Sequence, residues 1–101
     1  MYILIKDSVE DKYAPLLAAH AALACYKKYE EDNDMQTWIS TRFKKVICRV
    51  NDGKFKRALK EEKNIVLSET KLNLIESCAA FCPREEFAKP FRFFKMWEPT
   101  E

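Results

Sequence analysis

The only histidine of the chain, His20, lies in LLAAHAALACY, a run of alanines and leucines at residues 16–26. Imidazole exchanges protons near neutral pH more readily than other side chains, so its position raises two alternatives. It is either a hydrogen-bonded core residue or part of an active site. At 100° per residue, it shares one narrow arc of a helix with four other side chains: Tyr13, Leu16, Leu17 and Ala24.

The other reactive side chains are four cysteines: Cys25, Cys48, Cys78 and Cys82. They lie in apolar stretches without CxxC spacing, so a zinc site would need three or four of them to converge from distant segments. We expect buried free thiols, no metal and no other cofactor, as in a cytoplasmic protein.

Length and composition indicate a folded protein with a single domain, residues 1–101. Hydrophobic residues make up 48% of the chain and there is one glycine, which excludes a disordered or low-complexity linker. The net charge of +2 is lower than that of dedicated nucleic-acid binders but permits an RNA partner.

The first residues, YILIKD, form an apolar run that is too short and is interrupted too early by charge to be a signal peptide, and no apolar run approaches the length of a membrane span. A homodimer is left open.

Apolar patterning predicts four strands, at residues 2–5, 44–50, 64–69 and 76–83. It also predicts four helices. A long one at 12–32 has Pro15 in its first turn and alanines that let it lie close to a sheet. A short second helix is capped within residues 30–34, a third is capped by Asn51 or Asp52, and a fourth follows Pro83 at 84–89.

In the strand Ser77–Cys82, apolar side chains alternate to both faces, so we expect it to be central in the sheet. The aromatic tail, residues 91–97, should pack back on the domain. The predicted fold class is α/β, with a small four-stranded mixed sheet flanked by helices.

Basic side chains form a stripe on one face of the third helix. Such a stripe is either a solvated face or a surface that follows phosphates. With three further cations it makes our candidate RNA surface: Lys44, Lys45, Arg49, Lys56, Arg57 and Lys60.

Four segments, in this order, resemble the type 2 peptidyl-tRNA hydrolases. HAALACY (20–26) falls on the end of the family's Gly-Lys-x-x-Ala-Gln-x-x-His-Ala-Ala motif, and WISTRFKKVICRV (38–50) resembles its tryptophan, basic residues and second strand. SCAAFCP (77–83) resembles its closing strand, and FRFFKMW (91–97) its C-terminal segment. The resemblance is closest to a divergent branch, the peptidyl-tRNA hydrolase domain-containing proteins. It implies cleavage, without metal, of the ester that joins a peptide to the 3′ ribose of tRNA.

The resemblance also implies a set of site residues. The family's motif lysine falls on Tyr13 and its glutamine on Leu17, and Glu69 is the carboxylate nearest to its aspartate. A site with fewer polar groups than the family's would use Glu69 as base, His20 as proton partner and Ser77 as hydrogen-bond donor to the substrate. Lys12, or Lys6, would supply positive charge.

Two classes of function therefore stay open. One is an esterase acting on peptidyl-tRNA. The other is a domain on the same scaffold that binds RNA, a protein or a small ligand without turnover. An enzyme of different specificity is a third alternative, because a fold does not fix its chemistry.

Overall fold

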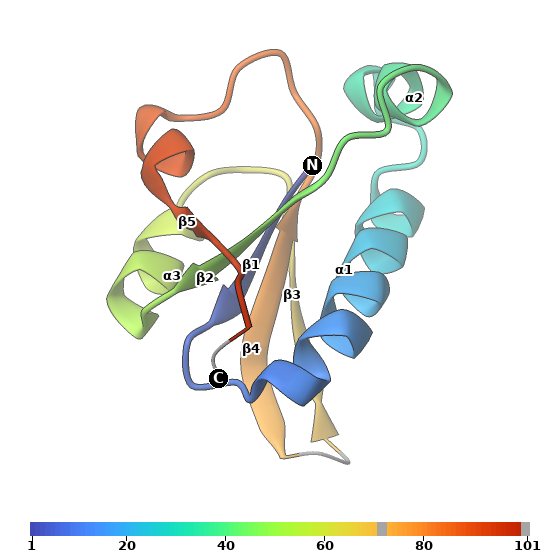
Figure 1. The fold of residues 1–101 in the computed structure, drawn as a ribbon. Helices are drawn as coiled ribbons and strands as arrows, with labels where there is room; N and C mark the ends of the chain where they lie inside the picture. The colour runs from blue at the N-terminus through green and yellow to red at the C-terminus, as the bar shows by residue number, and fades with distance from the viewer. Residues whose placement is uncertain (71–72, 100–101) are drawn as a thin grey trace.

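A mixed five-stranded sheet runs through the molecule in the order β3-β4-β1-β2-β5 (Figure 1). The computed structural model describes residues 1–70 and 73–99. The strands are β1 (Tyr2–Lys6), β2 (Val46–Val50), β3 (Asn64–Glu69), β4 (Leu74–Phe81) and β5 (Lys95–Met96). The β1–β2 pair is parallel, and the other neighbouring pairs of these described strands are antiparallel.

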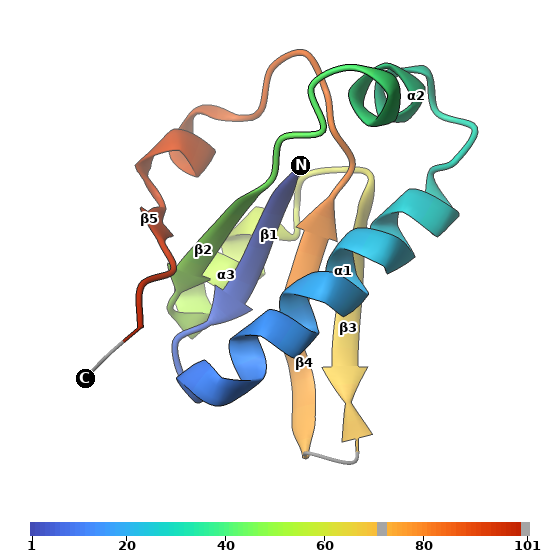
Figure 2. The ribbon, with the colours of Figure 1, turned by 45° about the vertical axis from the view of Figure 1, so that its right-hand side comes forward.

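Helices cover both faces of this sheet, as Figure 2 shows. On one face lie α1 (Ala14–Lys28), entered through the 3₁₀ turn η1 (Asp11–Tyr13), and α2 (Asn33–Ser40). On the other lie α3 (Asp52–Ala58) and the 3₁₀ helix η3 (Lys89–Phe93). Within the described ranges, no helix has the length and apolar character to cross a membrane.

The two faces are built from side chains of different size. We call the face under α1 the small-residue face, because six small side chains are buried there: Ala14, Ala21, Cys25, Cys78, Ala80 and Cys82. We call the other the aromatic face, because six rings gather on it: Tyr2, Phe55, Phe81, Phe87, Phe91 and Phe94. Successive residues of a strand point to opposite faces, so Ile3 and Ile5 belong to the first and Leu4 to the second.

Several sequence predictions are confirmed. The strand at 64–69 has the predicted bounds, β4 lies between β3 and β1, and Pro15 occupies the first turn of α1. Asn51 caps α3, its side chain accepting a hydrogen bond from the Lys54 amide at 2.8 Å.

The predicted helix at 12–32 is too long, because α1 ends at Lys28. The Asp32 carboxylate accepts hydrogen bonds from the amides of Asp34 and Met35, and its backbone is extended (φ −71°, ψ 134°). A residue that caps the start of one helix cannot continue the previous one. The intervening residues therefore turn between α1 and α2.

Two predictions about the C-terminal part are wrong. The predicted helix at 84–89 is absent, and the 3₁₀ helix η3 begins only at Lys89. Proline is tolerated in the first turn of a helix but not further inside it, and Pro90 occupies the first turn of η3. Arg84 also donates to the carbonyls of Cys82 and Glu62, which holds this segment beside the sheet. The predicted count of four strands misses β5, a two-residue strand that pairs with the edge of β2.

Candidate functional site

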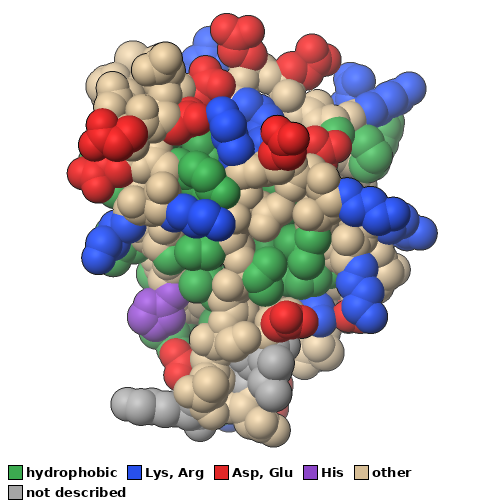
Figure 3. All heavy atoms as spheres, turned by 180° about the vertical axis from the view of Figure 1, so that it is seen from behind, with side chains coloured by type: hydrophobic (Ala, Val, Ile, Leu, Met, Phe, Trp, Pro, Cys, Tyr) green, Lys and Arg blue, Asp and Glu red, His purple; other side chains and the backbone are tan. Residues whose placement is uncertain are grey.

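His20 lines an open hollow of about 330 Å³ between α1 and the end of β3, which we call the α1–β3 hollow. Its walls are Leu17, His20, Leu23, Ala24, Lys27, Leu67, Ser68 and Glu69. Figure 3 shows the face of the molecule on which the histidine is exposed. The structure therefore brings together two of the four predicted catalytic side chains, His20 and Glu69.

The helix explains why His20 is exposed although it shares an arc with apolar residues. The buried stripe of α1 consists of Ala14, Leu17, Ala21 and Cys25, at spacings of three and four residues. His20 precedes Ala21 and so lies about 100° around the helix from it. It borders the stripe rather than belonging to it, which removes the alternative of a core histidine.

The pairing of β3 with β4 is irregular beside the opposite wall of the hollow. Leu67, Ser68 and Glu69 all line it, although successive side chains of a regular strand alternate between faces. The register of β3 against β4 shifts between Leu67 and Glu69, and such irregularities re-aim side chains. The Ser68 hydroxyl accepts a hydrogen bond from the Glu76 amide at 2.7 Å, across the same hairpin.

Ser77 lies in a different hollow, of about 380 Å³, which we call the Ser77 hollow. Because Cys78 belongs to the small-residue face, the preceding residue points to the other face. Ser77 is 4% exposed, and its hydroxyl oxygen makes no hydrogen bond to the part of the chain that the structure describes. It is therefore separated from His20 and Glu69 by the sheet itself.

The Ser77 hollow lies where β1 and β2 end. The chain leaves β1 for α1 on one face and leaves β2 for α3 on the other, which makes this the switch point of the parallel pair. Lys6 lines the hollow, and its ammonium lies 2.9 Å from the Asp52 carboxylate. Hydrogen bonds from Lys6 and then Lys56 lower the pKa of Asp52 below its usual value.

Lys12, the fourth predicted catalytic side chain, lines neither hollow. It lies on η1 with 67% of its side chain exposed, and its ammonium is 3.5 Å from the Glu10 carboxylate. The positive charge that the hollow offers near His20 is Lys27 instead. Sequence reasoning missed Lys27, although it follows His20 by seven residues, two helical turns on the same face.

The six cations of the predicted RNA surface do not share one face. Lys56 and Arg57 are exposed on α3, over the aromatic face, whereas Lys60 is exposed in the turn that follows, because α3 ends at Ala58. Arg49 points to the small-residue face, where it donates to the Asp11 carboxylate at 2.8 Å and stacks on Trp97.

Lys44 and Lys45 precede β2 beside α2, away from α3. The Lys45 ammonium lies 3.5 Å from the centre of the Phe43 ring, and the Lys44 carbonyl accepts a hydrogen bond from the Trp38 indole. The α3 cations and these two lysines are thus separate surfaces.

All four cysteines are free and buried. Burial raises the pKa of Cys25 and Cys78 to about 12 and that of Cys48 and Cys82 to about 11. A thiolate nucleophile at neutral pH is therefore disfavoured at each position. Among residues 1–70 and 73–99, no cluster of three or more His, Cys, Asp or Glu could hold a metal ion.

The geometry defines the structural class of the protein. It is an α/β domain whose mixed five-stranded sheet is flanked by three helices, with two separate hollows at the strand ends. No family model matches the chain, and no curated protein or solved structure matches it at a significant level.

Proposed function

We propose that this chain is a peptidyl-tRNA hydrolase-like domain that cleaves the ester between a peptide and the 3′ ribose of tRNA. The observation that carries the proposal is that His20 and Glu69, from distant parts of the sequence, line one solvent-open hollow. The motif segments described above supply the substrate class. The α/β class with a mixed sheet supports the proposal, although the sheet has five strands and not the four predicted.

Each side chain of the α1–β3 hollow has a chemical role in the proposal. Glu69 orients the water, and His20 takes its proton as the oxygen attacks the ester carbonyl. Lys27 stabilises the negative charge on the tetrahedral oxygen. When the C–O bond breaks, His20 returns the proton to the ribose oxygen. Leu23 and Leu67 offer apolar contact to a side chain of the peptide.

A cytoplasmic location is part of the proposal. Its substrate, tRNA, is used in translation, and four free cysteines are typical of a reducing compartment.

The second candidate is a domain that binds RNA, a protein or a small ligand without turnover. Two observations favour it. Ser77 lies in another hollow, and the positions that match the family's lysine and glutamine hold Tyr13 and the buried Leu17. The α1–β3 hollow therefore brings fewer polar side chains to an ester than the sites of the type 2 peptidyl-tRNA hydrolases do.

The decisive measurement is hydrolysis of an N-acetyl-aminoacyl-tRNA by the wild-type chain and two variants. His20→Ala should lower kcat/KM by about 10²–10⁴-fold, the range for removal of a general acid–base group, without changing Tm. Leu16→Ala is the matched control, since Leu16 is on the same helix, 42% exposed and outside the hollow. It should retain full activity.

Two results would contradict the proposal. Wild-type protein that binds tRNA but hydrolyses nothing would establish the binding domain instead. Robust hydrolysis that survives His20→Ala would show that the ester is cleaved elsewhere.

A further inference from the structure

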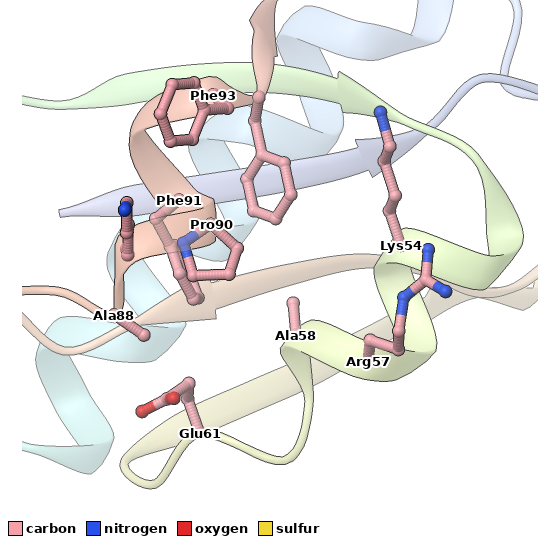
Figure 4. A pocket seen from close by; sticks show the side chains of 10 residues that line it. Lys54, Arg57, Ala58, Glu61, Ala88, Pro90, Phe91 and Phe93 are labelled. Carbon is pink, nitrogen blue, oxygen red and sulfur yellow. The ribbon is translucent and has the colours of Figure 1, made fainter.

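A third depression, the α3–tail groove, lies on the aromatic face between α3 and η3 (Figure 4). It has a volume of about 450 Å³, within the range of small-ligand sites. Its lining residues are Lys54, Arg57, Ala58, Glu61, Ala88, Lys89, Pro90, Phe91, Phe93 and Phe94. These described residues are all different from those that line the two hollows at the strand ends.

One wall of the groove presents an aromatic ring to solvent. Phe91 is 2% exposed and packs edge-on against Tyr2 and Phe81, so it belongs to the core. Phe93, two residues later in η3, is 69% exposed. An exposed phenylalanine beside an apolar groove offers a flat face on which a planar group can stack.

Three cations border the same groove. Among residues 1–70 and 73–99, Lys54, Arg57 and Lys89 find no partner for an ion pair or a side-chain hydrogen bond. Lys56, on another side of α3, is by contrast held 3.0 Å from the Asp52 carboxylate. In Figure 4, Lys54 and Arg57 stand on α3 across the groove from the aromatic side chains. The site is therefore apolar inside and positively charged at its border.

Glu61 adds a carboxylate to the lining. It can accept a hydrogen bond from the amino group of cytosine or adenine, as carboxylates accept from cytosine in known complexes. An aromatic face, cations for phosphate and one carboxylate together match a nucleotide.

We propose that the α3–tail groove binds unpaired nucleotides of a single-stranded RNA segment. One base stacks on Phe93, Lys54 and Arg57 contact the flanking phosphates, and Glu61, at the other end of the groove, accepts from an amino group of a neighbouring base. The inference deepens the proposed function, on which it rests for RNA as the class of partner. It stands on residues that take no part in the proposed hydrolysis.

The test measures fluorescence anisotropy of labelled eight-nucleotide RNA strands with the 101-residue chain at low salt. Phe93→Ala should weaken binding at least about fivefold, since removal of a base stack typically costs that much or more. Phe93→Tyr should retain binding because it keeps the ring. Oligo(C) and oligo(A) should bind more tightly than oligo(U), which lacks an amino group, and Glu61→Gln should reduce that preference.

Phe43→Ala is the matched control. Phe43 is also exposed, at 53%, and its ring lies beneath a cation, Lys45, as that of Phe93 lies beneath Arg92, but Phe43 is next to α2. Its replacement should leave the affinity unchanged. Arg57→Glu should weaken binding to all three strands. It should also lower the slope of log affinity against log salt by about one, because one cation then no longer neutralises a phosphate.

Four outcomes would overturn the inference. They are unchanged affinity in Phe93→Ala, equal weakening in Phe43→Ala, tighter binding of an acidic peptide than of RNA, or a dimer that Phe93→Ala dissociates. The proposed function stands or fails independently of these results. If the groove binds RNA but the chain hydrolyses no peptidyl-tRNA, this inference holds and the proposed function fails. If hydrolysis depends on His20 but RNA binding does not depend on Phe93, the proposed function holds and this inference fails.

Discussion

The two faces of the sheet are filled in opposite ways. On the small-residue face a helix of 15 residues lies against alanine and cysteine side chains, and α1 packs on β1, β3 and β4. On the aromatic face a helix of seven residues and a 3₁₀ helix of five are spaced from the sheet by phenylalanine rings. Small side chains allow close approach of a long regular helix, whereas large rings fill the space beneath short segments.

This difference also decides where ligands can enter. The close packing of α1 leaves an opening at the end of β3, where the pairing with β4 is irregular and where His20 lies. The rings beneath α3 and η3 leave a groove between those segments, with Phe93 at its border. One face thus carries the proposed chemistry and the other the proposed RNA contact.

The largest effect should come from the aromatic face. Phe91→Ala should lower the free energy of unfolding by about 3–5 kcal/mol, because Phe91 is buried at the contact of four other rings. Phe93→Ala, two residues away and exposed, should change it by less than about 0.5 kcal/mol. Urea unfolding followed by circular dichroism measures both. Equal destabilisation would mean that η3 does not hold the tail in this orientation.

A change of the opposite kind tests the small-residue face. Ala21→Leu should cost about 1–3 kcal/mol, because Ala21 has no exposed surface between α1 and the sheet and added methylene groups have no space. Ala19→Leu, on the exposed side of the same helix, should be nearly neutral, since leucine and alanine have similar helix propensities. Thermal melts of the two variants compare them directly. If Ala21→Leu melts like wild type, α1 is not held closely to the sheet.

The smallest effect concerns the polar contacts at the end of the small-residue face. There Tyr29 and Lys28 donate to the Asn64 carbonyl, each at 2.9 Å, and the Lys63 ammonium lies 2.7 Å from the Asp32 carboxylate. The hydrogen bond from Lys63 lowers the pKa of Asp32 below its ordinary value of 3.8. The carboxylate therefore adds stability above that value and loses it as the pH falls through the lowered pKa.

Asp32→Asn keeps an N-cap but removes this charge, so it should cost about 0.5–1 kcal/mol at pH 7. The difference from wild type should shrink as the pH falls below 3.8, because Asp32 of the unfolded chain then takes up a proton while the native carboxyl, with its lowered pKa, is still charged. Urea midpoints at neutral and at acidic pH provide the measurement, with Glu31→Gln, an exposed neighbour, as control. Destabilisation of the same size at both pH values would indicate a poorer cap rather than a missing ion pair.

Local patterns were sufficient for most elements. The apolar run at 64–69, the alternation in β4 and the caps at Asp32 and Asn51 depend on neighbours within a few residues. Two errors were local as well, since α1 ends before the cap at Asp32 and Pro90 lies in the first turn of η3. The missed strand depends instead on a distant contact. β5 pairs with β2 through two residues only, and such a short strand carries too little periodicity to be read from the sequence.

The candidate site divides in the same way. The sequence pattern singled out His20 and the resemblance assigned Glu69, and the fold brings both to one hollow. The resemblance also assigned Ser77, yet the pleat directs its side chain to the other face. The six predicted cations failed to form one surface for the same reason, because Arg49 and the α3 cations lie on opposite sides of the sheet.

By itself the sequence determined the α/β class, the order of most elements and the chemistry available to them, since hydrophobic periodicity and capping act over a few residues. Only the tertiary structure decided which groups meet. The packing of α1 beside the end of β3 places His20 and Glu69 on one hollow, and the exposed side of η3 presents Phe93 to a groove bordered by α3. These juxtapositions depend on strand register and on how closely each helix approaches the sheet, and both are set by packing between residues far apart in the chain.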